Sequence, residues 1–161
     1  ELESELSKGT IFNIYLPKAK STDTEIIHEA EEAATLSEGN EKILVVEDDP
    51  YVLDIAVRTL YRYGFRVLQA SDGEEALELC RRLKEPVDLV LSDVVMPRMN
   101  GVQLIKKIRE FWPDTEVLLM SGYSHNALPD SDDYFKEYPF IQKPFHPADF
   151  TAKIRSILNK K

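Results

Sequence analysis

The sequence predicts an α/β domain in which a parallel sheet is covered by helices on both faces. Short apolar stretches alternate with longer amphipathic stretches, as in chains that repeat strand and helix. The short stretches are rich in Val, Ile and Leu without polar alternation, which is typical of strands buried on both faces. The length of 161 residues, 43% of them hydrophobic, suits one compact domain with additional segments.

Residues 42–64 contain the first predicted strand and helix. The stretch KILVVE has the β-branched, apolar composition of a buried strand. Asp49 and Pro50 follow at the positions of an N-cap and a first helical residue. Gly64 comes directly after the amphipathic stretch and predicts the end of this helix.

The later elements repeat this order. Strands are expected at residues 65–70, 88–92, 115–121 and 139–142, and helices at 71–84, 101–112 and 146–160. Ser71 or Asp72, followed by Glu74 or Glu75, forms the capping-box pattern of a helix start. Between the last two strands we expect a short or distorted helix at about 127–135, because a proline and four acids leave room for roughly two turns.

The first 41 residues lie outside this repeat, which occupies residues 42–161. Residues 1–17 end in GTIFNIYLP, whose alternating apolar residues predict one β-strand stopped by Pro17. Residues 18–41 are polar and acidic, and they predict a linker. A short helix at about 24–34 is the alternative to a solvated tether, because Glu and Ala favour helix.

Charge and cysteine content exclude several classes of protein. The formal net charge of −9 argues against nonspecific nucleic-acid binding. Cys80 is the single cysteine, so no disulfide forms within the chain and a reducing, cytoplasmic setting fits. No apolar run is long enough to cross a membrane. The charged start ELESELSKG has no signal-peptide core.

Five polar side chains are expected at one edge of the sheet. Glu47 and Asp48 follow the first strand, Asp93 and Ser121 end the third and fourth, and Lys143 follows the fifth. The carboxyl ends of parallel strands meet where this class of fold binds ligands. Each residue alone has an ordinary alternative as a cap, a turn residue or a solvated side chain. Their joint placement favours a functional site.

Three clustered carboxylates predict a bound divalent cation. Like charges at short range leave at least one carboxyl group protonated, whereas a hard cation with oxygen ligands and open positions removes that repulsion. Mg²⁺ is therefore the expected cofactor. A carboxylate, a hydroxyl and an ammonium group beside such an ion indicate phosphoryl transfer.

Residues 43–160 resemble a response-regulator receiver domain of the CheY-like class. The matching stretches are ILVVED, DLVLSDVVMPRMNG, VLLMSGY and FIQKPF. The resemblance implies a flavodoxin-like fold, with five parallel strands in the order 2-1-3-4-5 and helices on both faces. It also implies phosphorelay signal transduction, in which the domain catalyses its own phosphorylation from a phosphohistidine.

The resemblance implies a role for each matching position. Asp93 would be the phosphoacceptor, and Ser121 and Lys143 would bind the phosphoryl oxygens. Ser121 and Phe140 would act as switch residues. The peptide bond between Lys143 and Pro144 would be cis, which is a minority form for bonds before proline.

Four oxygen-bearing groups would hold Mg²⁺ if the resemblance extends to the metal site. Asp48 and Asp93 would bind the ion directly, Glu47 through water, and Val95 through its backbone carbonyl. Val95 and Tyr123 also stand two residues beyond Asp93 and Ser121, at positions that tune loss of the phosphoryl group in this family. An apolar and a bulky residue there predict a comparatively long-lived phosphoryl state.

The stretch LSKGTIFNIYLP resembles the last strand of a histidine-kinase ATPase domain. The nucleotide-binding motifs of that domain are absent from the chain, so ATP binding is not expected here. The resemblance implies a hybrid sensor histidine kinase. Its kinase core would be the partner in cis, and a histidine phosphotransfer protein is the second candidate partner. The remnant strand is expected to pair with another chain or with the domain surface.

Two other functions stay open at this point. A stand-alone single-domain response regulator would act as a protein-binding switch through the same chemistry. A Mg²⁺-dependent phosphatase would need a second aspartate two residues after the nucleophile, where this chain has Val95. For the favoured function we expect a cytoplasmic location, no nucleic-acid partner and no membrane contact by this chain, while the parent kinase would be free to carry a membrane anchor.

Overall fold

The computed structural model describes residues 1–16, 40–122 and 137–159. The chain forms two compact units, Glu1–Thr35 and Leu36–Lys161. The described part of the smaller unit contains a two-stranded sheet, and that of the larger unit a five-stranded sheet.

The five strands of the larger unit are parallel and lie in the predicted order. Their order across the sheet is β4-β3-β5-β6-β7, which is 2-1-3-4-5 when counted within this unit, and each neighbouring pair is parallel. The strands are β3 (Lys42–Val46), β4 (Arg66–Ala70), β5 (Leu89–Asp93), β6 (Glu116–Ser121) and β7 (Phe140–Gln142). The last residue of the central strand, Asp93, is therefore held between neighbours on both sides.

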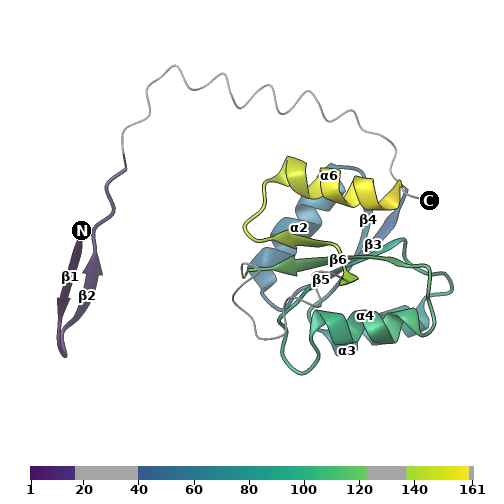
Figure 1. The fold of residues 1–161 in the computed structure, drawn as a ribbon, viewed down its shortest axis with the longest axis horizontal. Helices are drawn as coiled ribbons and strands as arrows, with labels where there is room; N and C mark the ends of the chain where they lie inside the picture. Colours follow the sequence, from purple (N-terminus) through teal and green to yellow (C-terminus); the bar gives the residue numbers. More distant parts are fainter. Residues whose placement is uncertain (17–39, 123–136, 160–161) are drawn as a thin grey trace, which may run out of the picture. The chain divides into compact units, whose positions relative to one another are not determined.

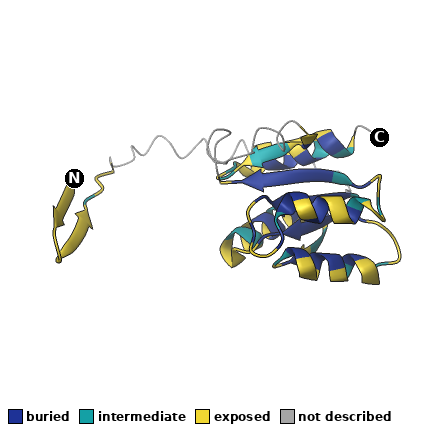
Figure 2. Ribbon diagram, turned by 60° about the horizontal axis from the view of Figure 1, so that its bottom comes forward, coloured by how far each residue is buried: buried dark blue, intermediate teal, exposed yellow. Residues whose placement is uncertain are grey.

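Helices cover both faces of this sheet, as the sequence predicts. They are α2 (Pro50–Arg62), α3 (Gly73–Arg82), α4 (Gly101–Arg109) and α6 (Pro147–Leu158). In Figure 1, α2 and α6 lie on one side of the sheet and α3 and α4 on the other. Alternate residues of β3 divide accordingly: Ile43 and Val45 pack with α2 and α6, whereas Leu44 and Val46 pack with α3 and α4. Figure 2 shows the buried strands between these layers.

The helices begin at capping residues. Asp49 caps α2 and Asp72 caps α3, each by accepting two backbone N–H groups. The α3 start confirms the capping pattern, and there the Glu75 carboxylate accepts from both Ser71 N–H and Ser71 Oγ. α4 begins with a capping box between Asn100 and Gln103, which the sequence analysis did not identify.

Helix α4 ends earlier than the periodic pattern predicts. The pattern extends to residue 112, but α4 ends at Arg109. The N–H groups of Phe111 and Trp112 both bond to the carbonyl oxygen of Ile108, which closes the last turn. Pro113 follows, and a residue before proline disfavours helical backbone angles. The expected helices at about 24–34 and 127–135 lie outside the described residues.

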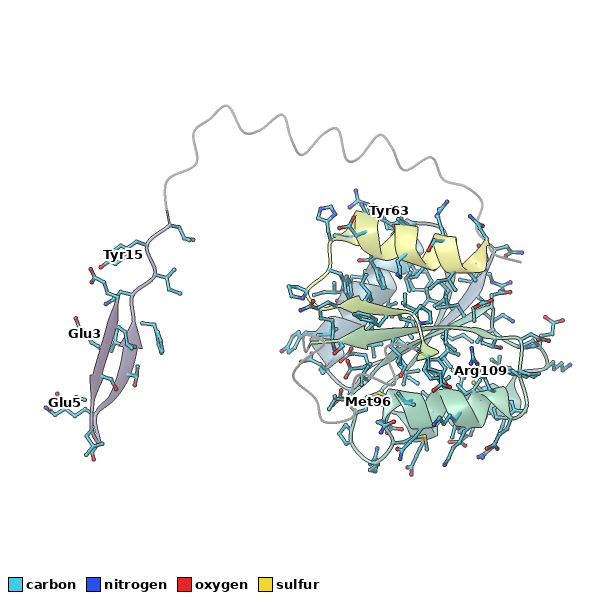
Figure 3. The ribbon with its side chains drawn as sticks, viewed as in Figure 1. Glu3, Glu5, Tyr15, Tyr63, Met96 and Arg109 are labelled. Atoms are coloured by element: carbon cyan, nitrogen blue, oxygen red, sulfur yellow. The ribbon has the colours of Figure 1, made fainter. Side chains whose placement is uncertain are left out.

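The N-terminal segment forms a hairpin. The expected strand is present, but it ends at Phe12 and not at Pro17, and a second strand that was not predicted precedes it. β1 (Leu2–Glu5) pairs antiparallel with β2 (Gly9–Phe12), and the chain reverses through positive φ angles at Ser7 and Gly9. Both strands are exposed throughout, as Figure 2 shows by their colour. Beyond β2, the hydroxyl of Tyr15 (Figure 3) donates to a Glu1 carboxylate oxygen. The strand that was expected to pair with another chain or with the domain surface instead pairs with β1.

Candidate functional site

The predicted polar residues meet at the carboxyl edge of the parallel sheet. Glu47 and Asp48 directly follow β3, and Asp93 is the last residue of β5. Carboxylate oxygens from these three residues lie within 4.8 Å of one another. Glu47 and Asp93 are buried, at 2% and 6% exposure, while Asp48 is exposed. One side of the cluster is therefore open to solvent, and the other is enclosed by the fold.

Lys143 lies between the two buried carboxylates. Its Nζ is 2.9 Å from Oε2 of Glu47 and 2.8 Å from Oδ1 of Asp93. The backbone of Lys143 is held beside β6, because its N–H donates to the carbonyl oxygen of Ser121 at 2.7 Å. The peptide bond to Pro144 is cis, as the resemblance implies.

Burial and like charge work against ionisation of the two carboxyl groups. Burial raises the pKa of Asp93, the bonds to Lys143 oppose the rise, and the charge of Asp48 adds to it. Burial likewise raises the pKa of Glu47, against its hydrogen bond to Lys143 and together with the charge of Asp93. Burial lowers the pKa of Lys143, but its bonds to Asp93 and Glu47 outweigh that and leave the pKa raised. One ammonium group thus faces three acids.

This donor set fits a magnesium ion. Beside Lys143, the cluster offers three carboxylates, the oxygen ligands that hard divalent cations prefer. Burial and the neighbouring acids raise the pKa of Glu47 and of Asp93, and a bound cation would oppose both effects. The exposed Asp48 leaves one side open for the water molecules that Mg²⁺ retains.

The loop after β5, residues 94–100, is folded tightly beside Asp93. The backbone N–H of Val95 donates to Oδ2 of Asp93 at 3.1 Å. Val94 N–H bonds to the Met120 carbonyl, and Gly101 N–H bonds to the Val94 carbonyl. A Cβ atom at Gly101 would lie 2.1 Å from the carbonyl oxygen of Asp93, so only glycine permits this approach. We call residues 94–100 the acceptor loop.

A comparison with known families decides which class this site belongs to. The family model of the response regulator receiver domain matches residues 43–155, which is most of the chain. The chain belongs to the response regulator receiver family.

Curated relatives include proteins of two architectures. The chain is 35% identical over 164 residues to the sensor kinase CckA of Brucella abortus, an alignment that covers 98% of this chain and 17% of that protein. It is 32% identical to the response regulator receiver protein CpdR of the same organism, over 73% of this chain and 96% of that protein. The chain thus spans a small part of one relative and nearly all of the other.

Solved structures agree with the fold. A crystal structure of the receiver domain from the hybrid histidine kinase CckA matches with a TM-score of 0.61 and 33% identity, over 73% of this chain and 98% of that one. The chemotaxis protein CheY4 of Vibrio cholerae matches with a TM-score of 0.65 and 26% identity, over 74% and 99%. The chain therefore carries a flavodoxin-like receiver domain of a two-component phosphorelay. Receiver domains generally bind Mg²⁺ at an acidic pocket, and they interact with histidine kinases or phosphotransfer proteins.

The two expected switch residues lie on neighbouring strands of the receiver. Ser121 ends β6 and is buried, at the carboxyl edge shared with Asp93. Phe140 begins β7 and is partly buried against a core cluster that contains Val94 and Tyr138. Gly122, the last residue described before the gap, is exposed. Tyr123 lies outside the described residues.

The receiver has one apolar surface at the site that sequence analysis missed. Val52 and Ile55 of α2, with Lys143, Pro144 and Phe145, line a hollow that is mainly apolar. Ile55 is 59% exposed, and Tyr51, one turn before it on α2, is 81% exposed. The signal in the sequence is this pair at spacing i, i+4, outside the buried stripe of α2, which consists of Ala56, Val57 and Leu60. We call this surface the α2 hollow.

Proposed function

We propose that Asp93 accepts a phosphoryl group from a phosphohistidine, and that Glu47, Asp48, Asp93 and the backbone carbonyl of Val95 hold the Mg²⁺ this reaction needs. One observation carries the proposal: a buried carboxylate ends the central strand, within 4.8 Å of two further carboxylates and 2.8 Å from a lysine ammonium group. Such an arrangement holds an acceptor, a cation site and a positive clamp in fixed positions.

The chain's own residues account for the transfer step. The nitrogen–phosphorus bond of the donor breaks, its electron pair stays on the imidazole nitrogen, and a bond forms between phosphorus and a carboxylate oxygen of Asp93. Lys143 and the hydroxyl of Ser121 bind the phosphoryl oxygens, and the ammonium group of Lys143 offsets part of their charge. When bound, Mg²⁺ supplies the remaining positive charge at those oxygens.

Incubation with acetyl phosphate or beryllofluoride and Mg²⁺ tests this function. We expect a stable adduct on Asp93, detected as one added phosphoryl group by intact mass spectrometry or as shifted amide resonances around the site. Asp93→Asn should abolish it. Rapid turnover of small phosphate esters without an adduct would instead support a phosphatase, the competing reaction class.

We further propose that the receiver belongs to a hybrid sensor histidine kinase, with the kinase core as partner in cis. The alignment with the sensor kinase CckA covers 98% of this chain, whereas that with CpdR covers 73%. The added coverage includes the hairpin region, which is outside the family match at residues 43–155. A stand-alone regulator is the alternative. If the hybrid arrangement is correct, radiolabelled ATP added to the full-length gene product should label a histidine first and then Asp93. In this arrangement we place the receiver in the cytoplasm.

The α2 hollow is the surface on which we propose that the phosphodonor docks. It adjoins Lys143 and exposes apolar side chains, so a helix that presents a phosphohistidine could bury them as it approaches Asp93. Ile55→Asp should slow transfer from a histidine phosphotransfer protein or kinase core by about tenfold. It should leave phosphorylation by acetyl phosphate unchanged. Equal loss with both donors would contradict docking at this surface.

We propose that Val95 prolongs the phosphorylated state. Its side chain is 48% exposed, and it stands two residues beyond the acceptor, where an apolar group cannot orient an attacking water molecule. Val95→Asn should speed loss of the phosphoryl group, measured by the decay of the labelled protein, and Val95→Ile is the apolar control. An unchanged decay rate in Val95→Asn would refute this role.

A further inference from the structure

The acceptor loop contains one strained residue, Arg98. Its φ angle is +66°, a left-handed conformation that L-residues other than glycine, asparagine and aspartate rarely adopt. The N–H of Met99 bonds to the carbonyl oxygen of Pro97 at 2.7 Å. Arg98 is thus the central residue of a γ-turn with positive φ, which is the rare and strained form. A contact elsewhere must hold this turn in place.

The start of helix α3 supplies that contact. The guanidinium of Arg98 donates to Oδ2 of Asp72, the N-cap residue of α3. The other carboxylate oxygen, Oδ1, accepts the N–H groups of Glu74 and Glu75. One carboxylate therefore caps the helix and binds the loop at the same time. The carboxylate of Glu74 lies farther from Arg98, at 4.0 Å.

A second, apolar contact lies directly beside this ion pair. Met99 is buried, and a Cβ atom at Gly73 would lie 2.9 Å from its Sδ and 3.1 Å from its Cβ. Glycine at position 73 thus permits close packing of the α3 start against the loop. Two consecutive loop residues, Arg98 and Met99, are therefore joined to two consecutive residues of α3, Asp72 and Gly73.

We propose that Arg98 is a positioning residue, and that its ion pair with Asp72 holds the acceptor loop in the geometry in which Asp93 and Val95 bind Mg²⁺. The loop is short, and its first residues carry the Val95 N–H that bonds to Asp93. Arg98 lies between the buried Met96 and Met99, three residues after Val95, so a change in its turn alters the backbone that follows Val95. The inference rests on the proposed magnesium site and adds a residue that does not touch it.

Three variants separate the ion pair from the strain. Arg98→Ala keeps the strain and loses the pair, whereas Arg98→Gly loses both, because glycine adopts positive φ without strain. Asp72→Asn keeps the helix cap, since asparagine caps as well as aspartate, and weakens the pair. We expect Mg²⁺ affinity, measured by calorimetry, to fall about tenfold in Arg98→Ala and Asp72→Asn. In Arg98→Gly it should stay within about threefold of the wild type.

The double variant provides the decisive comparison. Asp72→Asn should have no further effect in the Arg98→Gly background, because a glycine turn does not need the pair. Hydrogen exchange of the amides of residues 94–96 and 98–100, measured without metal, should be faster in Arg98→Ala than in the wild type. Glu74→Gln is the matched control for a nearby charge, and Arg82→Ala is the control for an exposed ion pair on the same helix. Thermal unfolding of each variant shows that the fold is retained.

Two outcomes would overturn the inference. Mg²⁺ affinity in Arg98→Ala equal to that of the wild type would show that the pair does not position the loop. An equal effect of Asp72→Asn with arginine or glycine at position 98 would show that Asp72 acts through α3 alone. A wild-type protein that binds no Mg²⁺ would refute the proposed function instead, so the two failures are distinguishable.

Discussion

Asp93 and Asp72 are two aspartates that flank the acceptor loop, and their environments are opposite. Asp93 ends a buried strand, where burial raises its pKa more than Lys143 lowers it. Asp72 caps a helix, where hydrogen bonds from backbone N–H groups and the charge of Arg98 hold its pKa below the ordinary value. Asp72 is therefore stabilised as an anion by its contacts, whereas burial and a neighbouring acid oppose the ionisation of Asp93. A cation bound at Asp93 would offset that opposition.

The largest effect on the phosphorylation rate is expected from Lys143, whose ammonium group contacts both Asp93 and Glu47. Lys143→Ala removes the only ammonium group that contacts the carboxylate cluster within the described residues. Phosphorylation by acetyl phosphate should slow by about 100-fold or more, the usual loss when one preorganised donor is removed. Lys143→Arg retains the charge with a different shape and should lose less. A rate within a factor of two of the wild type in Lys143→Ala would contradict the proposed clamp.

The next effect tests the other aspartate. Asp72→Ala removes a helix cap and an ion pair, so the free energy of unfolding should fall by about 1–2 kcal/mol. Urea denaturation measures this, and Asp72→Asn, which keeps the cap, should recover most of the loss. If Asp72→Ala unfolds like the wild type, Asp72 does not stabilise the fold as a helix cap.

The opposite sign is expected for Asp93. Asp93→Asn removes one of three repelling carboxylates, so the metal-free protein should become more stable at neutral pH. Its thermal midpoint, measured with a chelator, should rise by a few degrees, since about 1 kcal/mol shifts a small domain by roughly 4–8 °C. Saturating Mg²⁺ should raise the midpoint of the wild type and reverse their order. A lower midpoint of the metal-free variant would mean that Asp93 is already compensated.

The dependence of stability on pH separates the two aspartates again. Glu47 and Asp93 have raised pKa values in the folded protein. Their stabilising contribution is therefore complete below pH 4.5 for Glu47 and below pH 3.8 for Asp93, and it is lost as the pH rises through the pKa of the folded state. Asp72 has a lowered pKa, so its contribution is present above 3.8 and is lost as pH falls. As pH rises above 3.8, metal-free Asp93→Asn should therefore lose less stability than the wild type. Parallel curves from urea midpoints would contradict this.

The smallest effect is expected at an exposed ion pair on α3. Arg82 and Glu78 pair one turn apart, and both side chains are mostly exposed. Arg82→Ala should change the free energy of unfolding by no more than about 0.5 kcal/mol, because solvent screens such pairs. The measurement is the same urea titration. A loss as large as that of Asp72→Ala would remove the distinction between a cap and a surface pair.

The strands and the carboxylate cluster could be predicted because both depend on local sequence. Each apolar stretch ends where polar residues begin, so the last residue of each strand is visible, and parallel strands bring those ends to one edge. Glu47, Asp48, Asp93 and Lys143 are therefore brought together as expected. The cis bond before Pro144 followed from the family resemblance.

The missed features depend on contacts that local sequence does not encode. Arg98 and Asp72 are 26 positions apart, and they meet only because Gly73 lets α3 approach the loop. The hairpin was missed because β1, LESE, has no run of apolar residues. β1 instead pairs with β2 along the backbone, and the hydroxyls of Ser4 and Thr10 lie 2.9 Å apart across the pair.

The position of Trp112 makes the receiver convenient to study by fluorescence. It is the single tryptophan of the chain, and it lies beyond the far end of α4, with its ring 5.3 Å from that of Phe111. In Figure 3, Met96, near the acceptor, and Arg109, near this end, are labelled towards opposite ends of α4. We therefore expect the emission of Trp112 to change when the domain unfolds but not when Mg²⁺ binds. Fluorescence would then report whether the domain is folded, while calorimetry measures the binding of Mg²⁺.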